Sequence, residues 1–273
     1  MTSPVPVTTG TLTVPGARLH YELRGSGPLL AIVGSPMAAE PFAPLADLLA
    51  ADHTVLTADP RGHFGSVVDD PEADSTPEAR ADDLARLIRH VDAGPAIVLG
   101  SSGGAVTTLA LVQAQPELVR TAVAHEPPLV QLLEDREQQL AANEDTVATF
   151  VGGDRLGAIR KFMAYAGFVM PEPVFLQMFG GEKSPDELAS ERYFYLHDMH
   201  GTIDWAPDLD ALRDTSVHLV IGIGATSAGQ LCDRTSRTIA TELKTEPSIF
   251  PGGHGGFMED PTGFADRLRE VIG

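Results

Sequence analysis

The sequence contains little cysteine and little basic charge. Its 273 residues include one cysteine, Cys232, which excludes an internal disulfide and a cysteine cluster for zinc or iron–sulfur. We interpret Cys232 as a small apolar filler, since nothing around it in the sequence favours a reactive thiolate. Only 19 residues are lysine or arginine, against 38 aspartate or glutamate, and the formal net charge is −19. Because nucleic-acid binding requires basic surface, a nucleic-acid partner is not expected.

Long apolar runs are also absent. No run approaches the roughly 18 to 20 residues of a membrane-spanning helix. The N-terminal segment MTSPVPVTTG has neither the basic nor the apolar region of a secretion signal. These absences predict a cytoplasmic protein with no membrane partner. Hydrophobic residues still make up 43% of the chain, so we expect a large core, either one elaborated domain or a core with an inserted subdomain.

Strand and helix patterns alternate along most of the chain. Continuous apolar runs such as PLLAIVG and AIVLG indicate strands buried on both faces, and helical stretches lie between them. This alternation predicts an α/β fold with a mostly parallel central sheet flanked by helices. Between residues 128 and 206 the pattern changes to helix formers and aromatics without a clear buried strand. The predicted domains are therefore a first core part, 1–127, an α-helical cap, 128–206, and a second core part, 207–273.

Small residues crowd the stretch Gly100-Ser101-Ser102-Gly103-Gly104, between an expected strand and an expected helix. A sharp strand-to-helix turn strains its central residue and requires small residues two positions away, where Gly100 and Gly104 stand. This is the G-x-S-x-G pattern of a nucleophile elbow, which exposes the Ser102 hydroxyl and aims the Gly103 backbone N–H at a substrate oxygen. The alternative is a glycine-rich turn without a catalytic role.

A nucleophilic serine requires a base, and His254 in FPGGHGGFMEDP is the strongest candidate among nine histidines. It follows a predicted strand, lies in a glycine-flanked loop and comes after the serine in chain order. His63 and His125 are weaker candidates. The alternative interpretation of His254 is a histidine in a surface loop.

These motifs together resemble the α/β-hydrolases that carry a helical cap. The stretch ADPRGHFGS resembles the D-x-R-G-x-G-x-S segment of many members, although Phe64 stands where that segment has its second glycine. The stretch AIVGSPM falls where the family carries its oxyanion loop, with Val33 in place of a frequent histidine. The resemblance implies that the backbone N–H of Ser35 is the second oxyanion donor, since Pro36 has no N–H.

The catalytic acid is where the sequence departs from most of that family. Most members place an aspartate after the strand that ends here in VIGIGATSAG, which contains no carboxylate. In a minority the acid follows the strand after the nucleophile's helix, and there the sequence reads VAHEPPL. The resemblance thus implies Glu126 as the acid that orients the catalytic histidine, with Asp233 as the reserve candidate. Alternatively, Glu126 caps the first cap helix or pairs with an arginine.

A narrower similarity is local. The stretches GSSGGAVTT and AHEPPL resemble fungal zearalenone lactonases, which hydrolyse a macrocyclic resorcylate lactone with serine, glutamate and histidine. This similarity supports the triad better than it supports the substrate.

The predicted function is a serine hydrolase acting on the carboxylic ester or lactone of a hydrophobic small molecule. Met37, Met199 and Trp205 are candidate pocket residues, because the cap is rich in apolar and aromatic side chains. No metal or organic cofactor is expected, and we interpret His197 and His200 as cap-surface or pocket-lining residues. Alternatives are a carbon–carbon bond hydrolase, an acyltransferase, or a binding protein that has lost turnover. The sequence does not indicate the oligomeric state.

Overall fold

The computed structural model describes residues 5–273. The first four residues of MTSPVPVTTG, the segment that lacks the pattern of a secretion signal, lie outside the described residues. Within the described residues, nine strands form one sheet in the order β1-β2-β4-β3-β6-β7-β8-β9, and β5 pairs with β2. The strands are β1 (Val7–Val14), β2 (Ala17–Gly25), β3 (Leu29–Val33), β4 (Thr54–Ala58), β5 (Val67–Val68), β6 (Ala96–Ser101), β7 (Val119–His125), β8 (His218–Gly224) and β9 (Ser248–Phe250).

The sheet is parallel from β4 through β9. β1, β4 and β5 each pair with β2 in antiparallel register, whereas every neighbouring pair from β4 to β9 is parallel. The predicted fold class, a mostly parallel sheet flanked by helices, is therefore confirmed. The short strand β5 had no signal in the sequence.

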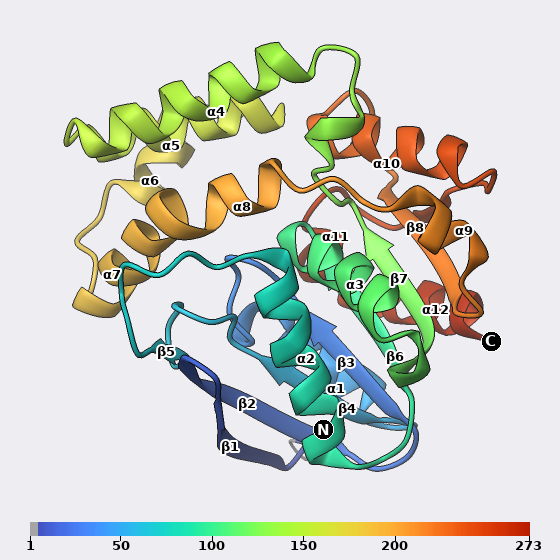
Figure 1. The fold of residues 1–273 in the computed structure, drawn as a ribbon. Helices are drawn as coiled ribbons and strands as arrows, with labels where there is room; N and C mark the ends of the chain where they lie inside the picture. The colour runs from blue at the N-terminus through green and yellow to red at the C-terminus, as the bar shows by residue number, and fades with distance from the viewer. Residues whose placement is uncertain (1–4) are drawn as a thin grey trace.

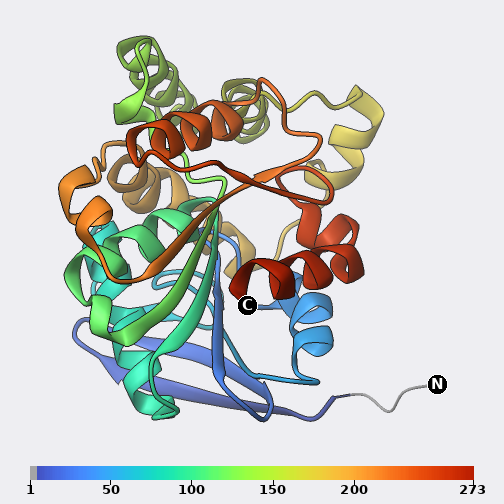
Figure 2. The same ribbon diagram turned by 90° about the vertical axis from the view of Figure 1, so that its right-hand side faces the viewer.

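Helices cover both faces of the sheet. The core helices are α1 (Ala43–Leu49), α2 (Pro77–Val91), α3 (Gly103–Ala114), α9 (Leu209–Asp214), α10 (Leu231–Glu242), α11 (Gly256–Glu259) and α12 (Pro261–Ile272). Short 3-10 turns occur at η1 (Glu40–Phe42), η2 (Pro116–Leu118) and η3 (Val130–Leu132). Figure 2 shows α1 and α12 on one side of the sheet and α2 and α3 on the other.

Successive residues of a buried strand pack alternately against the helices on the two faces of the sheet. In β3, Leu30 and Ile32 pack with α1 and α12, whereas Ala31 and Val33 pack with α2 and α3. All four are at most 8% exposed. Because side chains alternate across a strand, a sheet covered on both faces needs a continuous apolar run, which is why PLLAIVG lacks an alternating pattern.

Between β7 and β8 the described chain contains helices and no strand. Besides η3 and α9, these are α4 (Arg136–Val151), α5 (Arg155–Ala166), α6 (Glu172–Phe179), α7 (Pro185–Tyr193), the π-helical turn η4 (Phe194–Asp198) and α8 (Met199–Ile203). Figure 1 shows α4 to α8 gathered above the sheet. The domain boundaries at 128 and 206 stay a prediction. Along residues 5–273, no helix combines the length and the apolar character needed to cross a membrane.

His125 lies at the end of β7 in the middle of the core. Its side chain is fully buried, and its ring packs edge-on against Phe250 and Phe264. Its Nδ1 lies 3.4 Å from the Ser101 Oγ. Burial disfavours the charged imidazolium and lowers the pKa of His125 from 6.5 to about 4.

His125 therefore makes the fold sensitive to acid. Because the folded-state pKa lies below the unfolded value, the unfolded chain binds more protons between pH 6.5 and pH 4, and stability falls as the pH falls through that window. Between pH 7 and pH 5 we expect the wild type to lose about 2 kcal/mol relative to His125→Leu. Urea unfolding of both proteins at each pH measures this difference. A difference that does not change with pH would contradict the prediction.

Candidate active site

The residues predicted to carry the chemistry follow four strands of the parallel part of the sheet. Ser35 comes after β3, Ser102 after β6, Glu126 after β7 and His254 after β9. The carboxyl ends of parallel strands meet at one edge of the sheet, and in open α/β sheets ligands bind at that edge. The fold thus brings together side chains that are up to 219 residues apart in the sequence.

The turn between β6 and α3 has the geometry expected of an elbow. Ser102 has φ 56° and ψ −125°, a conformation that a residue with a side chain rarely adopts. A Cβ on Gly100 would lie 2.2 Å from the Gly104 carbonyl oxygen, and a Cβ on Gly104 would lie 2.2 Å from the Val33 carbonyl oxygen. Both flanking positions therefore require glycine, for the steric reason anticipated from the sequence.

Glu126 and His254 are joined by a short hydrogen bond. The distance from His254 Nδ1 to Glu126 Oε2 is 2.6 Å, and the other carboxylate oxygen accepts a hydrogen bond from the Gly224 backbone N–H at 2.8 Å. Glu126 is fully buried and has φ 54°. With Nδ1–H donated to the carboxylate, the other ring nitrogen of His254 is free to accept a proton.

Burial and pairing act in opposite directions on both groups. Burial favours the neutral carboxyl, but the hydrogen bond and charge of His254 outweigh burial, and the pKa of Glu126 is lowered. Burial also opposes the imidazolium, but the Cys232 sulfur and the Glu126 carboxylate beside the ring outweigh it and raise the pKa of His254. The site therefore stabilises the charged imidazolium that forms when the histidine takes a proton.

The reserve acid, Asp233, is engaged elsewhere. One of its carboxylate oxygens accepts a hydrogen bond from Arg237 at 2.7 Å, and the other accepts one from the Gly229 backbone N–H at 2.9 Å. Glu126, and not Asp233, is the carboxylate bonded to His254.

The two other candidate bases also lie away from this pair. His63 is fully buried, and its ring nitrogens bond Ser190 Oγ at 2.8 Å and Asp198 Oδ2 at 3.2 Å. His125 packs in the core below the carboxyl edge. Neither imidazole is hydrogen-bonded to the Glu126 carboxylate, which orients His254.

The two predicted oxyanion donors lie against each other. Gly103 is the first residue of α3, so its N–H has no partner within the helix. A Cβ on Gly103 would lie 2.7 Å from the Ser35 carbonyl oxygen, which places the two segments in contact. Within residues 5–273, neither the Gly103 N–H nor the Ser35 N–H donates a hydrogen bond to another protein atom.

Ser102 and His254 open into one cavity of about 940 Å³. Its walls come from the core and from the cap, and most of the side chains that line it are apolar. The methionine and aromatic lining residues are Met37, Phe42, Phe64, Phe162, Met163, Phe168, Met170, Met178, Phe179, Phe194, Tyr195 and Met258. A cavity of this size and lining suits a hydrophobic small molecule.

Of the three predicted pocket residues, Met37 lines this cavity, and Met199 and Trp205 lie outside its lining. Met199 is 2% exposed and packs inside the cap. Trp205 packs against the sheet core and donates its indole N–H to Glu78 at 2.9 Å. The prediction that these two residues line the pocket is therefore wrong. Met199 packs within the cap, and Trp205 joins the cap to the core.

Several lining residues had no distinguishing signal in the sequence. Phe168 lies between α5 and α6, and its ring centre is 5.4 Å from that of His254. Phe64 adopts φ 48° at the position where the family pattern has glycine, and its side chain lines the cavity. The departure at Phe64 was visible in the sequence, but its consequence for the pocket was not.

The cap histidines show no arrangement typical of a metal site. His197 bonds Asp74 at 3.0 Å, and His200 lies 3.4 Å from Glu144. Among residues 5–273, no group of three or more histidine, cysteine, aspartate or glutamate side chains has a metal-binding arrangement.

A model of the family described as "Alpha/beta hydrolase family" matches residues 21–267, nearly the whole chain. The chain belongs to the α/β-hydrolase family. It is similar to YraK of Bacillus subtilis (strain 168), an uncharacterized hydrolase, with 31% identity over 97% of this chain and 96% of YraK. The zearalenone hydrolase of Bionectria ochroleuca is 23% identical over 97% of both chains.

Among solved structures, the enol-lactonase of Burkholderia xenovorans LB400 superimposes with a TM-score of 0.71 at 17% identity. The superposition covers 96% of this chain and 99% of the enol-lactonase. At this identity the likeness concerns the fold. The family match identifies the protein as a hydrolase.

The charge of Glu126 can be tested on the ring of His254. We expect Glu126→Gln to lower the pKa of His254, because the variant loses the carboxylate that stabilises the imidazolium. Titration of the imidazole proton signals by NMR measures the shift. The matched control is Asp233→Asn, which removes a carboxylate paired with Arg237 and should leave the His254 titration in place. A His254 pKa that responds to Asp233→Asn and not to Glu126→Gln would reverse the assignment.

Proposed function

We propose that the protein is a serine hydrolase that cleaves the carboxylic ester or lactone bond of a neutral, apolar small molecule. The observation that carries the proposal is the 2.6 Å hydrogen bond between His254 and Glu126. His254 and the strained residue Ser102 line the same largely apolar cavity. A base oriented by a carboxylate and a serine that lines the same cavity are the groups that acyl transfer to a hydroxyl requires.

In the first half-reaction, the Ser102 hydroxyl oxygen attacks the carbonyl carbon while His254 takes the hydroxyl proton. The carbonyl oxygen becomes an oxyanion and accepts hydrogen bonds from the backbone N–H groups of Gly103 and Ser35, each donor contributing about 10²- to 10³-fold in rate. As the tetrahedral intermediate collapses, the bond to the leaving alkoxide breaks and His254 returns the proton to it.

In the second half-reaction, water replaces the serine as the nucleophile. His254 removes a proton from the water as its oxygen attacks the Ser102 ester carbonyl, and the same two N–H groups stabilise the second oxyanion. Breaking the acyl–oxygen bond releases the carboxylic acid and returns the proton to Ser102. With a lactone substrate the alcohol and the acid stay on one molecule, so the product is a hydroxy acid.

The charged residues of the cavity disfavour an anionic substrate. Its two strongly basic lining residues are Arg155 and Lys183. Arg155 forms an ion pair with Glu191 at 2.7 Å, and Lys183 forms one with Glu187 at 3.0 Å. A substrate carboxylate would therefore enter without an available counter-charge, and burying an unpaired charge is unfavourable.

A resorcylate macrolactone of the zearalenone type is the specific candidate substrate. The stretches around Ser102 and Glu126 resemble zearalenone lactonases, and a zearalenone hydrolase is similar over nearly the whole chain. Such a molecule is neutral and largely apolar, in keeping with the methionine and phenylalanine lining.

The role of Ser102 is tested by substitution. We expect Ser102→Ala to lose at least about 10⁴-fold in kcat, because the nucleophile is gone. Hydrolysis of p-nitrophenyl butyrate and loss of zearalenone by mass spectrometry measure turnover, and a fluorophosphonate probe measures labelling. Ser101→Ala removes the neighbouring hydroxyl and should still be labelled. Wild-type turnover by Ser102→Ala would refute the proposal.

The products of these assays separate the remaining activities of the fold. A hydroxy acid from zearalenone establishes lactone hydrolysis, and ester cleavage alone keeps the serine mechanism without the macrolactone. Transfer of the butyryl group to an added alcohol in preference to water identifies an acyltransferase. Silence on both substrates favours a carbon–carbon bond hydrolase or, where fluorophosphonate labelling also fails, a binding protein.

The preference for a neutral substrate gives a second prediction. We expect kcat/KM for p-nitrophenyl butyrate to exceed that for mono-p-nitrophenyl succinate at least about 10-fold, because the succinate carboxylate finds no free cation. Glu191→Gln releases Arg155 from its ion pair and should raise kcat/KM for the succinate ester selectively. Equal or faster turnover of the succinate ester by the wild type would contradict this account of the pocket.

A further inference from the structure

A buried polar network connects the cap to the segment that carries the predicted oxyanion donor Ser35. Its centre is Asp198, the last residue of the π-helical turn η4, which is 1% exposed. One carboxylate oxygen accepts hydrogen bonds from Ser35 Oγ at 2.6 Å and His63 Nε2 at 3.2 Å. The other accepts from Arg80 Nη1 at 2.5 Å and Thr202 Oγ1 at 2.9 Å. We call these five residues the Asp198 network.

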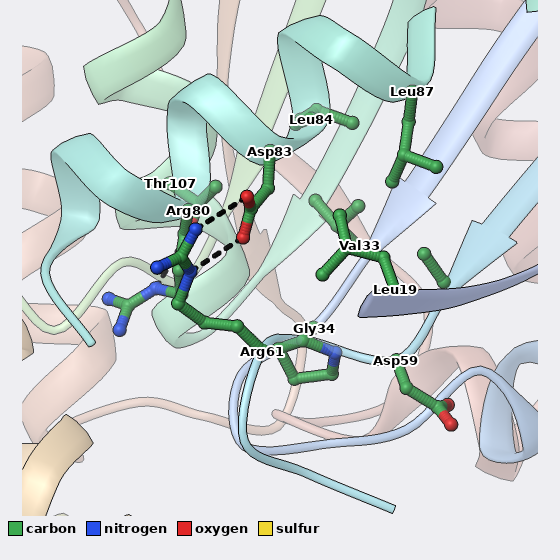
Figure 3. Close-up of a pocket in the computed structure, with 12 residues that line it drawn as sticks. Leu19, Val33, Gly34, Asp59, Arg61, Arg80, Asp83, Leu84, Leu87 and Thr107 are labelled. Carbon is green, nitrogen blue, oxygen red and sulfur yellow. Dashed lines mark hydrogen bonds and ion pairs between the residues drawn. The ribbon is translucent and has the colours of Figure 1, made fainter. Parts of the chain in front are cut away.

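Arg80 extends the network to Gly103, the other predicted oxyanion donor. This side chain is 3% exposed and also donates to Ser75 and to the hydroxyl of Thr107 at 3.1 Å. Thr107 in turn donates to the carbonyl oxygen of Gly103, also at 3.1 Å. Figure 3 shows Arg80 and Thr107 together below α2, with Gly34 across a small cavity. The two residues predicted to donate to the oxyanion, Ser35 and Gly103, are thus both bonded to one set of buried polar side chains.

The charges in this network are balanced. Burial opposes ionisation of Asp198, but Arg80, His63 and Ser35 outweigh it and lower the pKa of that carboxyl. A buried carboxylate with four donors has little freedom to turn, so it fixes the groups that it bonds. Ser35 is the one member of the network that belongs to the predicted oxyanion loop.

We propose that Asp198 is a positioning residue that fixes the Ser35 segment to the cap and thereby holds the second oxyanion donor in place. The inference rests on the hydrolase function proposed above. The same π-helical turn places Phe194 and Tyr195 in the wall of the substrate cavity. The position of the cap over the substrate and the alignment of the Ser35 N–H are therefore set by one short segment.

The informative substitution is made at Ser35, because Asp198→Asn would leave Arg80 buried without its counter-charge and endanger the fold. Ser35→Ala keeps the backbone N–H and removes only the hydroxyl that bonds Asp198. The matched control is Ser75→Ala, which removes a buried hydroxyl bonded to Arg80 at 3.1 Å and leaves the oxyanion loop untouched. Thermal unfolding of both variants verifies that they are folded.

With p-nitrophenyl butyrate, we expect Ser35→Ala to lower kcat about 10- to 100-fold with KM within about twofold of wild type, since the donor acts in the transition state. We expect Ser75→Ala to keep both constants within about twofold. Wild-type kcat for Ser35→Ala, a change in KM alone, or equal losses of kcat in both variants would overturn the inference. If Ser102→Ala is active on the same ester, the proposed function itself fails; if it is inactive while Ser35→Ala is unimpaired, only the positioning role fails.

Discussion

The sharp turn from β6 into α3 is the constraint on which the rest of the site depends. Ser102 holds a strained backbone conformation, and that conformation persists because Gly100 and Gly104 allow backbone atoms to approach where no side chain fits. The same close approach brings Gly103 against the Ser35 segment. A single steric requirement therefore places Ser102 in the cavity wall and brings together the Gly103 and Ser35 segments, which are proposed to bind the oxyanion.

The position of the acid follows from the way neighbouring parallel strands share a carboxyl edge. The end of β8 offers no carboxylate, and it contributes the Gly224 backbone N–H to Glu126 from β7. Glu126 thus accepts one hydrogen bond from the end of β8 and one from His254. No aspartate follows β8, and the carboxylate at this edge comes from the glutamate after β7. The backbone of β8 holds that carboxylate through the Gly224 N–H.

Local patterns in the sequence were enough for the parts of the protein that depend on local sterics. The elbow glycines and the buried strands each follow from short stretches, and the sheet confirms the fold class. Met199 and Trp205 show where this reasoning ends, because an aromatic or methionine in a helical segment packs equally well inward or toward a cavity. The Asp198 network joins residues 118 and 163 positions apart, and no pattern along the chain indicates such pairs.

The π-helical turn explains how one segment faces both the cavity and the core. In an α-helix, residues four apart lie on the same face, so a regular helix would point Asp198 in the direction of Phe194. In η4 the Met199 N–H bonds the Phe194 carbonyl, five residues back, so the direction of Asp198 around the helix axis differs from that in a regular α-helix. Phe194 lines the apolar cavity, and Asp198 meets Arg80 and Ser35 in the core. One short segment thus contributes an aromatic side chain to the cavity and a carboxylate to the core, where Arg80 compensates its charge.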